Sequence, residues 1–161
     1  MPDRYPRRVT QPDVEGTDQK ILELLAGDGR MSFTDLGKAT GLSTSAVHQR
    51  VKRLESRGLI KAYGVTLDYE QLGLPLTAFV SITPIDVAQP DDAPARLAHL
   101  SAIEACHSVA GVESYILKVR VASPDGLEHL LQDIRAAANV TTRTTVVLST
   151  FYEDRPPISP V

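Results

Sequence analysis

The segment from Gly41 to Ile60 carries polar and basic side chains at helical spacing. Ser45, His48, Gln49 and Lys52 fall at i, i+3, i+4 and i+7, so they share one face of a predicted helix. Imidazole and amide groups can hydrogen-bond the edges of DNA bases, while ammonium and guanidinium groups can bind phosphates. This pattern favours non-covalent recognition of duplex DNA. The predicted DNA-binding residues are Thr44, Ser45, His48, Gln49, Lys52 and Arg53.

Two further predicted helices precede this face. The first follows a cap candidate at Thr17 or Asp18 and ends at Gly27. The second begins near Phe33, with Ser32 as the residue that caps it. Both contain apolar residues at the spacing of one buried helix face, which indicates a small helical domain.

The third predicted helix is capped by Ser43 or Thr44 and stops at Gly58. The short turn at Gly41 between the second and third helices is typical of a helix-turn-helix domain. A basic helix face can also be merely solvated, and Arg50 can instead brace the domain internally. The inward side of this helix is predicted to hold Val47, Val51 and Leu54.

The second half changes to alternating patterns that predict a βαββαβ order, the ferredoxin-like arrangement, so the fold class is α+β. With both helices on one face, the other sheet face needs cover, and a partner subunit can supply it. The strands are predicted at 76–85, 104–111, 114–122 and 142–153, with helices at 95–103 and 123–138 and an earlier strand at 59–68.

Charge is distributed unevenly along the chain. Residues 1–64 carry 11 Lys and Arg against 8 Asp and Glu, while residues 65–161 carry 6 against 12. A sign difference between halves is a hint of a half that faces nucleic acid. The single Cys106 excludes an internal disulfide framework and is predicted to be a buried thiol.

The sequence lacks the marks of a membrane protein, a secreted protein or an enzyme. No apolar run approaches the roughly 20 residues needed to span a bilayer, and the N-terminus does not read as a signal peptide. We therefore expect a cytoplasmic protein without membrane contact. We expect no catalytic residues, no metal and no cofactor, since the scattered histidines lack metal-ligand partners at useful spacing and Glu113 is a lone acid in a turn.

Motifs along most of the chain resemble one known family. DQKILELLAGDGRMSFTDLGKATGLSTSAVHQRVKRLESRGLIKAYGVTLD resembles the DNA-binding half of the Lrp/AsnC, or feast/famine, transcriptional regulators. The second half resembles their ligand-sensing αβ domain, through Gly111, Tyr115 to Val119 and Thr142-Arg143-Thr144. SVAGVESYILKVRVAS and ANVTTRTTVVLSTFYED are similar to actinobacterial members, among them the regulator of alanine dehydrogenase.

The resemblance implies a sequence-specific, DNA-binding, winged-helix-like regulator whose DNA binding responds to a free amino acid. It also implies homodimers that assemble further, commonly to octamers. The family's effector loop often has two aspartates, which Val112-Glu113-Ser114 replaces here. The predicted effector-binding residues are Gly111, Val112, Glu113, Ser114, Tyr115, Thr144 and Thr145.

The expected organisation has five parts. These are a flexible arm at 1–16, a helix-turn-helix domain at 17–64, a linker at 65–75, an amino-acid-sensing and oligomerisation domain at 76–155, and a tail at 156–161. Two other functions stay open: a small metabolic enzyme subunit or amino-acid-binding regulatory module without DNA binding, and a protein–protein adaptor. Salt-dependent binding to duplex DNA would distinguish a DNA-binding regulator from both of these alternatives.

Overall fold

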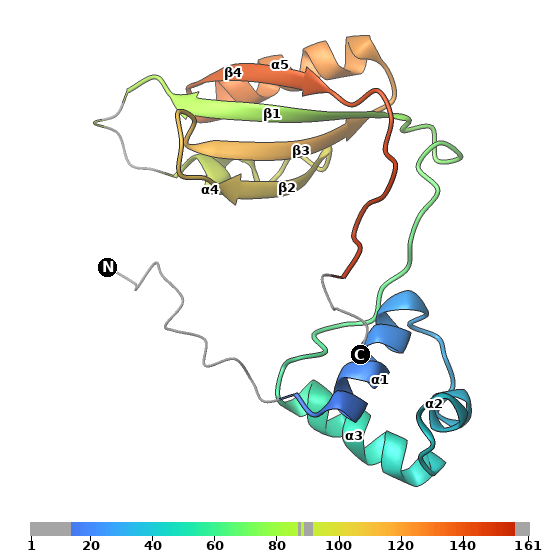
Figure 1. Cartoon of the computed structure of the whole chain (residues 1–161). Helices are drawn as coiled ribbons and strands as arrows, with labels where there is room; N and C mark the ends of the chain where they lie inside the picture. Colours follow the sequence, from blue (N-terminus) through green and yellow to red (C-terminus); the bar gives the residue numbers. More distant parts are fainter. Residues whose placement is uncertain (1–13, 87, 89–91, 157–161) are drawn as a thin grey trace. The chain divides into compact units, whose positions relative to one another are not determined.

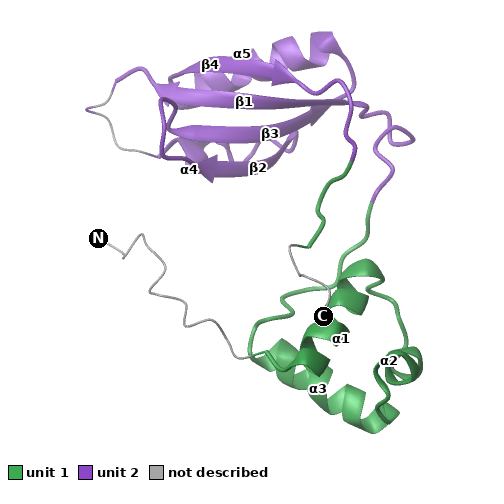
Figure 2. Ribbon diagram, viewed as in Figure 1, with its two compact units in different colours: residues 1–66, 152–161 green, residues 67–151 purple. Residues whose placement is uncertain are grey.

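The computed structural model of the chain describes residues 14–86, 88 and 92–156 (Figure 1). It divides into two compact units, residues 1–66 with 152–161 and residues 67–151 (Figure 2). The expected arm falls mainly on residues 1–13 and the expected tail mainly on residues 157–161, which lie outside the described residues.

The first unit is helical. It contains α1 (Gly16–Gly27), α2 (Phe33–Thr40) and α3 (Thr44–Ser56). The sequence predicted how α2 and α3 begin: Ser32 accepts the backbone N–H of Asp35, and Ser43 accepts that of Ala46. Side chains from all three helices form one core, because each helix turns an apolar stripe inward. The fully buried members are Ile21, Leu36, Val47, Val51 and Leu54.

The turn between α2 and α3 depends on two glycines. Gly41 ends α2 in the left-handed conformation, with φ of 73°, as the sequence predicts. Gly37 lies where the chain passes close over α2: the Leu42 N–H donates to the Gly37 carbonyl at 3.0 Å. A Cβ atom on Gly37 would lie 2.7 Å from the Leu42 carbonyl oxygen. A side chain at this position would therefore push α2 and the turn apart.

Two local predictions for this unit are wrong. The residue that caps α1 is Glu15, and its side chain makes no capping hydrogen bond; Asp18 is instead buried inside the unit. The segment 59–68 forms no strand, because in the described part of the chain no neighbouring strand completes a ladder with it. Part of this segment folds back along α3, where the Tyr63 hydroxyl donates to Glu55 at 2.9 Å.

The second unit is a four-stranded antiparallel sheet in the order β2-β3-β1-β4, the predicted ferredoxin-like topology. Helices α4 and α5 pack on one of its faces (Figure 1). Ser123 caps α5 as the sequence predicts, since its hydroxyl accepts the Gly126 N–H. The elements are β1 (Leu76–Pro84), α4 (Ala93–Leu97), β2 (Ile103–Ser108), β3 (Tyr115–Val121), α5 (Pro124–Ala138) and β4 (Val140–Val146).

The two faces of this sheet differ in chemistry, because successive strand residues point to opposite sides. The helix-covered face is apolar: Ala78, Val80 and Ile82 of β1 are fully buried against the helices. The other face includes Phe79, which is 42% exposed, and a cluster in which Glu104 forms ion pairs with Lys118 and Arg120. Among the described residues no helix covers that face, as the sequence predicts.

Three predictions for this unit need correction. The last strand ends at Val146 and not at 153, because Leu148 and Phe151 project into solvent at 95% and 91% exposure with no partner strand beside them in the described chain. The first helix is shorter than predicted and ends at Leu97. Cys106 is exposed and not buried, since it lies on β2 at the edge of the sheet.

We predict that Gly37→Val lowers the free energy of unfolding of the helical unit by about 1–3 kcal/mol, because overpacking against backbone forces a shift. Gly27→Val is the matched control, since a Cβ there meets no atom within 4 Å. Urea unfolding followed by circular dichroism measures both variants. An unfolding midpoint for Gly37→Val equal to that of Gly27→Val would show that the turn adapts without cost.

Candidate functional site

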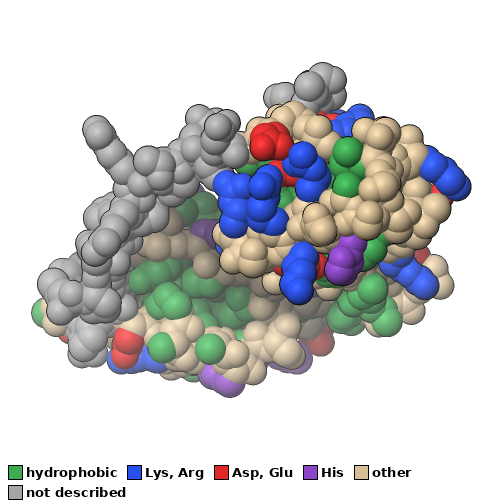
Figure 3. Space-filling view, turned by 90° about the horizontal axis from the view of Figure 1, so that it is seen from below, with side chains coloured by type: hydrophobic (Ala, Val, Ile, Leu, Met, Phe, Trp, Pro, Cys, Tyr) green, Lys and Arg blue, Asp and Glu red, His purple; other side chains and the backbone are tan. Residues whose placement is uncertain are grey.

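The third helix presents a polar face to solvent and an apolar face to the core. Val47, Val51 and Leu54 are buried, as predicted, so the residues between them must point outward. All six side chains predicted to bind DNA lie on exposed positions of α3. Figure 3 shows Lys and Arg side chains at several places on the surface of the helical unit, with a His side chain among them.

His48 is not an isolated side chain on this face. Its ring packs edge-on against the ring of Phe33, with centroids 5.4 Å apart and an angle of 62° between the planes. Phe33 is the first residue of α2, so this contact joins the exposed ends of α2 and α3. It restricts the imidazole to a defined place beside Gln49.

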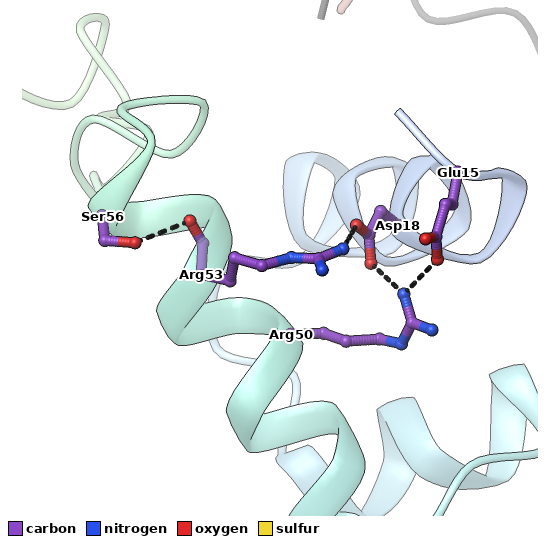
Figure 4. Close-up of polar contacts among 5 residues, drawn as sticks. All are labelled: Glu15, Asp18, Arg50, Arg53 and Ser56. Atoms are coloured by element: carbon purple, nitrogen blue, oxygen red, sulfur yellow. Dashed lines mark hydrogen bonds and ion pairs between the residues drawn. The ribbon is translucent and has the colours of Figure 1, made fainter. Parts of the chain in front are cut away.

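One buried carboxylate connects α1 to α3 (Figure 4). The side chain of Asp18 is fully buried, and its Oδ1 accepts from Arg50 Nη1 at 2.8 Å while its Oδ2 accepts from Arg53 Nη2 at 2.9 Å. Arg50 Nη1 also donates to Glu15 Oε2 at 2.8 Å. The alternative role for Arg50 as an internal brace is therefore confirmed.

The charges of this cluster balance. Burial alone would raise the pKa of the Asp18 carboxyl. The hydrogen bonds and charges of Arg50 and Arg53 together lower it by more than burial raises it, so the pKa lies below its ordinary value. The carboxylates of Asp18 and Glu15 face the two guanidinium groups, which makes the cluster formally neutral. Arg53, predicted to bind phosphate, thus shares its charge with Asp18 while its side chain stays 49% exposed.

In the sheet unit, the predicted effector loop is the turn between β2 and β3. The Ser114 N–H donates to the Ile82 carbonyl and the Ser114 carbonyl accepts from the Val109 N–H, both at 3.1 Å. Val112 at the tip is 91% exposed. Gly111 does not have a positive φ, and a Cβ atom there would meet nothing within 4 Å. The turn therefore does not require glycine at position 111.

Glu113 is paired with Arg143, which belongs to a motif shared with the family but is not among the predicted effector-binding residues. Its carboxylate accepts from Arg143 Nη2, which reaches from β4 past β1. Glu113 is largely covered, with its side chain 17% exposed, while that of Arg143 is 74% exposed. The pair places a carboxylate and a guanidinium side by side at the edge of the turn.

The remaining predicted effector residues are not gathered at this turn within one chain. Tyr115 is 5% exposed and belongs to the core under the helices. Thr144 and Thr145 pair with Val80 and Phe79, whereas the turn lies beside Ile82, further along β1. Because they are neighbours on a strand, the two threonines also point to opposite faces.

The described residues show no metal site and no membrane span. No group of three or more His, Cys, Asp or Glu side chains in ranges 14–86, 88 and 92–156 could hold a metal ion. Within those same ranges, every helix is too short or too polar to cross a bilayer.

Two families match the chain, one for each half. Residues 15–61 match the winged helix-turn-helix DNA-binding family, and residues 77–157 match the Lrp/AsnC ligand binding domain. Thus the surface on α3 and the turn after β2 fall within domains of known type.

Whole-chain relatives are regulators. The transcriptional regulator LrpA of Mycobacterium tuberculosis is 54% identical over 88% of this chain and 95% of its own length. The leucine-responsive regulatory protein of Haemophilus influenzae is 38% identical over 84% of each chain. A solved feast or famine regulatory protein from M. tuberculosis, complexed with L-methionine, superposes with a TM-score of 0.87 at 53% identity, covering 91% of this chain and 99% of that one.

We predict that Asp18→Asn lowers the free energy of unfolding at pH 7 by about 1–3 kcal/mol, because both arginines lose a charged acceptor. The folded-state pKa of Asp18 is lowered, so the stabilisation by its charge is present above the unfolded pKa and lost as pH falls through the folded one. The difference between parent and variant should therefore shrink below about pH 4.

Urea unfolding from pH 7 to pH 3 measures this difference, with Asp28→Asn as a control that removes an exposed carboxylate from the same unit. A difference that stays constant across this range would contradict a role for the ionised carboxylate.

Proposed function

The chain belongs to the Lrp/AsnC family of transcriptional regulators, and we propose that α3 reads its operator while the turn after β2 takes part in binding an amino-acid effector. It is a regulator with a DNA-binding helix-turn-helix and an amino-acid-binding domain, and it acts by binding and not by catalysis. Since a transcriptional regulator acts on DNA, we propose that this protein is located in the cytoplasm. The narrower likeness to the regulator of alanine dehydrogenase stays a prediction.

The exposed polar face of α3 carries the DNA-binding proposal. Its apolar side is fully buried, so the helix can enter a major groove with the opposite side and keep its core intact. Thr44, Ser45, His48 and Gln49 occupy the first half of the helix, where recognition helices contact base edges. Lys52 and Arg53 follow, and they suit the phosphates beside the groove.

We predict that Gln49→Ala weakens binding to the operator by about 1–3 kcal/mol and leaves binding to a random duplex nearly unchanged, because a Gln can bond adenine at N6 and N7. Fluorescence anisotropy measures both duplexes, the operator being a fragment that the protein selects from its source genome. Gln132→Ala is the matched control, since Gln132 is an exposed residue of α5 in the other unit.

Lys52→Ala provides the contrast in the same experiment. Loss of one phosphate contact should weaken binding to both duplexes and flatten the slope of log K against log salt by about 0.9. If Gln49→Ala weakened binding to the operator and to the random duplex equally, base reading by that side chain would be ruled out.

The pair of Glu113 and Arg143 supports the effector proposal. A free amino acid at neutral pH carries an ammonium and a carboxylate, and this pair offers a charge of opposite sign to each. The solved relative bound to L-methionine makes an amino acid of that kind the first effector to try. Thr144 and Thr145 lie away from the turn in one chain, so they would complete a site only in an assembly of copies.

We predict that Gly111→Thr abolishes amino-acid binding and leaves operator binding without effector unchanged. The variant should fold normally, because Gly111 has an ordinary φ and open space around it. Its side chain would occupy the approach to Glu113. Calorimetric titration with L-methionine, beside thermal melting, tests this; a variant that melts like the parent and binds methionine with equal affinity would place the effector elsewhere.

We propose that the open face of the sheet is the surface through which the chain forms a homodimer. In the described part of the chain no helix covers its face with Phe79, Glu104, Lys118 and Arg120, and a second copy can cover it across a two-fold axis. Such a homodimer would present two copies of α3 to half-sites about 34 Å apart. Further association to an octamer, common in the family, would bring several effector turns into one particle.

A further inference from the structure

The buried carboxylate of Asp18 lies where the fold would accept an apolar side chain. It precedes Ile21 by three residues, on the side of α1 that faces the core. Taking a carboxylate out of water is costly, and a buried ion pair often gives no more stability than well-packed apolar residues. Stability alone therefore does not account for a charge at this position.

What Asp18 does provide is a fixed place for two side chains of α3. Its two oxygens each accept from a different guanidinium, and Arg50 and Arg53 are almost one helical turn apart. Arg50 is held a second time by Glu15 and is the less exposed of the two. Arg53 contacts the carboxylate through Nη2, and about half of its side chain remains exposed.

The exposed part of Arg53 borders the polar face of α3. It follows Gln49 by four residues, so the two side chains are neighbours on the helix surface. A guanidinium has five N–H donors in a planar fork, so it can bond a buried carboxylate and a second anion together. An ammonium at this position is a single point charge without that fork.

We propose that Asp18 is a positioning residue for DNA binding: it holds the guanidinium of Arg53 so that the donors it does not use meet a phosphate when α3 enters the groove. The proposal rests on the DNA-binding function proposed above. It explains why a charge is buried under the recognition helix, since a pre-oriented arginine loses less side-chain entropy when it binds.

This role makes a different forecast from two simpler ones. If Arg53 supplies only positive charge, Arg53→Lys should bind DNA as the parent does. If Asp18 only neutralises the arginines, Asp18→Asn should bind all DNA more tightly, because the protein becomes more positive. Under the proposal both variants lose affinity for the operator.

The experiment measures binding of parent, Asp18→Asn, Arg53→Lys and the double variant to the selected operator and to a random duplex, over a range of salt. We expect each single variant to weaken operator binding about tenfold. For Arg53→Lys the salt slope should stay that of the parent, because the charge is kept. The double variant should be no weaker than either single variant, since both remove one linked contact.

The controls separate the possible failures. Asp28→Asn removes an equal charge from an exposed position of the same unit and should keep the parent's ratio of operator to random affinity. All binding is measured well below each thermal midpoint, and Arg53→Lys changes a half-exposed side chain that the core does not need. A parent that does not prefer the operator over the random duplex would overturn the proposed function itself.

Given a parent that does prefer its operator, three results would overturn the positioning role alone. These are operator binding by Arg53→Lys equal to the parent's, tighter binding of both duplexes by Asp18→Asn, and fully additive losses in the double variant.

Discussion

The helical unit depends on one requirement: α3 must be fixed firmly on one side while its other side stays polar and open. Three apolar residues fix it by packing, but packing alone leaves the long flanking arginines unconstrained. The carboxylate of Asp18 removes that freedom, since both of its oxygens are occupied by guanidinium groups of α3. The close approach of the chain to Gly37 also fixes α3, because it brings the start of α3 tightly against α2. The apolar core, the Asp18 ion pairs and the contact at Gly37 therefore together hold the polar face of α3 in place.

The sheet unit solves a related problem by alternation. Every second residue of β1 and β3 enters the core under α4 and α5, which leaves the intervening residues to form a second surface. That surface mixes an exposed Phe79 with the ion pairs of Glu104, a combination suited to contact with another copy of the chain. At the end of the same sheet lies the ion pair of Glu113 and Arg143, where we propose that a zwitterionic effector binds. Under these two proposals, assembly and effector binding would be linked through one sheet.

Local chemistry made much of this fold predictable. Hydroxyl caps at Ser32, Ser43 and Ser123, the glycine at the end of α2 and the alternation in β1 are each decided within a few residues. Contacts between distant residues were not predictable: Asp18 resembles a helix cap in sequence, but its partners are 32 and 35 positions away. A charge within an apolar stripe was the available signal. The segment 59–68 alternates like a strand, yet a ladder needs a partner that periodicity cannot reveal. The position of Thr144 and Thr145 relative to the turn depends on the register between β4 and β1, which the sequence does not reveal. In the observed register the two threonines lie away from the turn.

The central claim is that one chain couples DNA recognition on α3 to an amino acid bound by the sheet unit. Its most direct test is the selection of bound fragments from the source genome by the purified protein, with and without L-methionine and an amino-acid mixture. The account predicts enriched fragments that share a motif with two-fold symmetry, and an affinity for them that changes when an amino acid is present. Enrichment no greater than that of random fragments, or affinities that no amino acid alters, would contradict it.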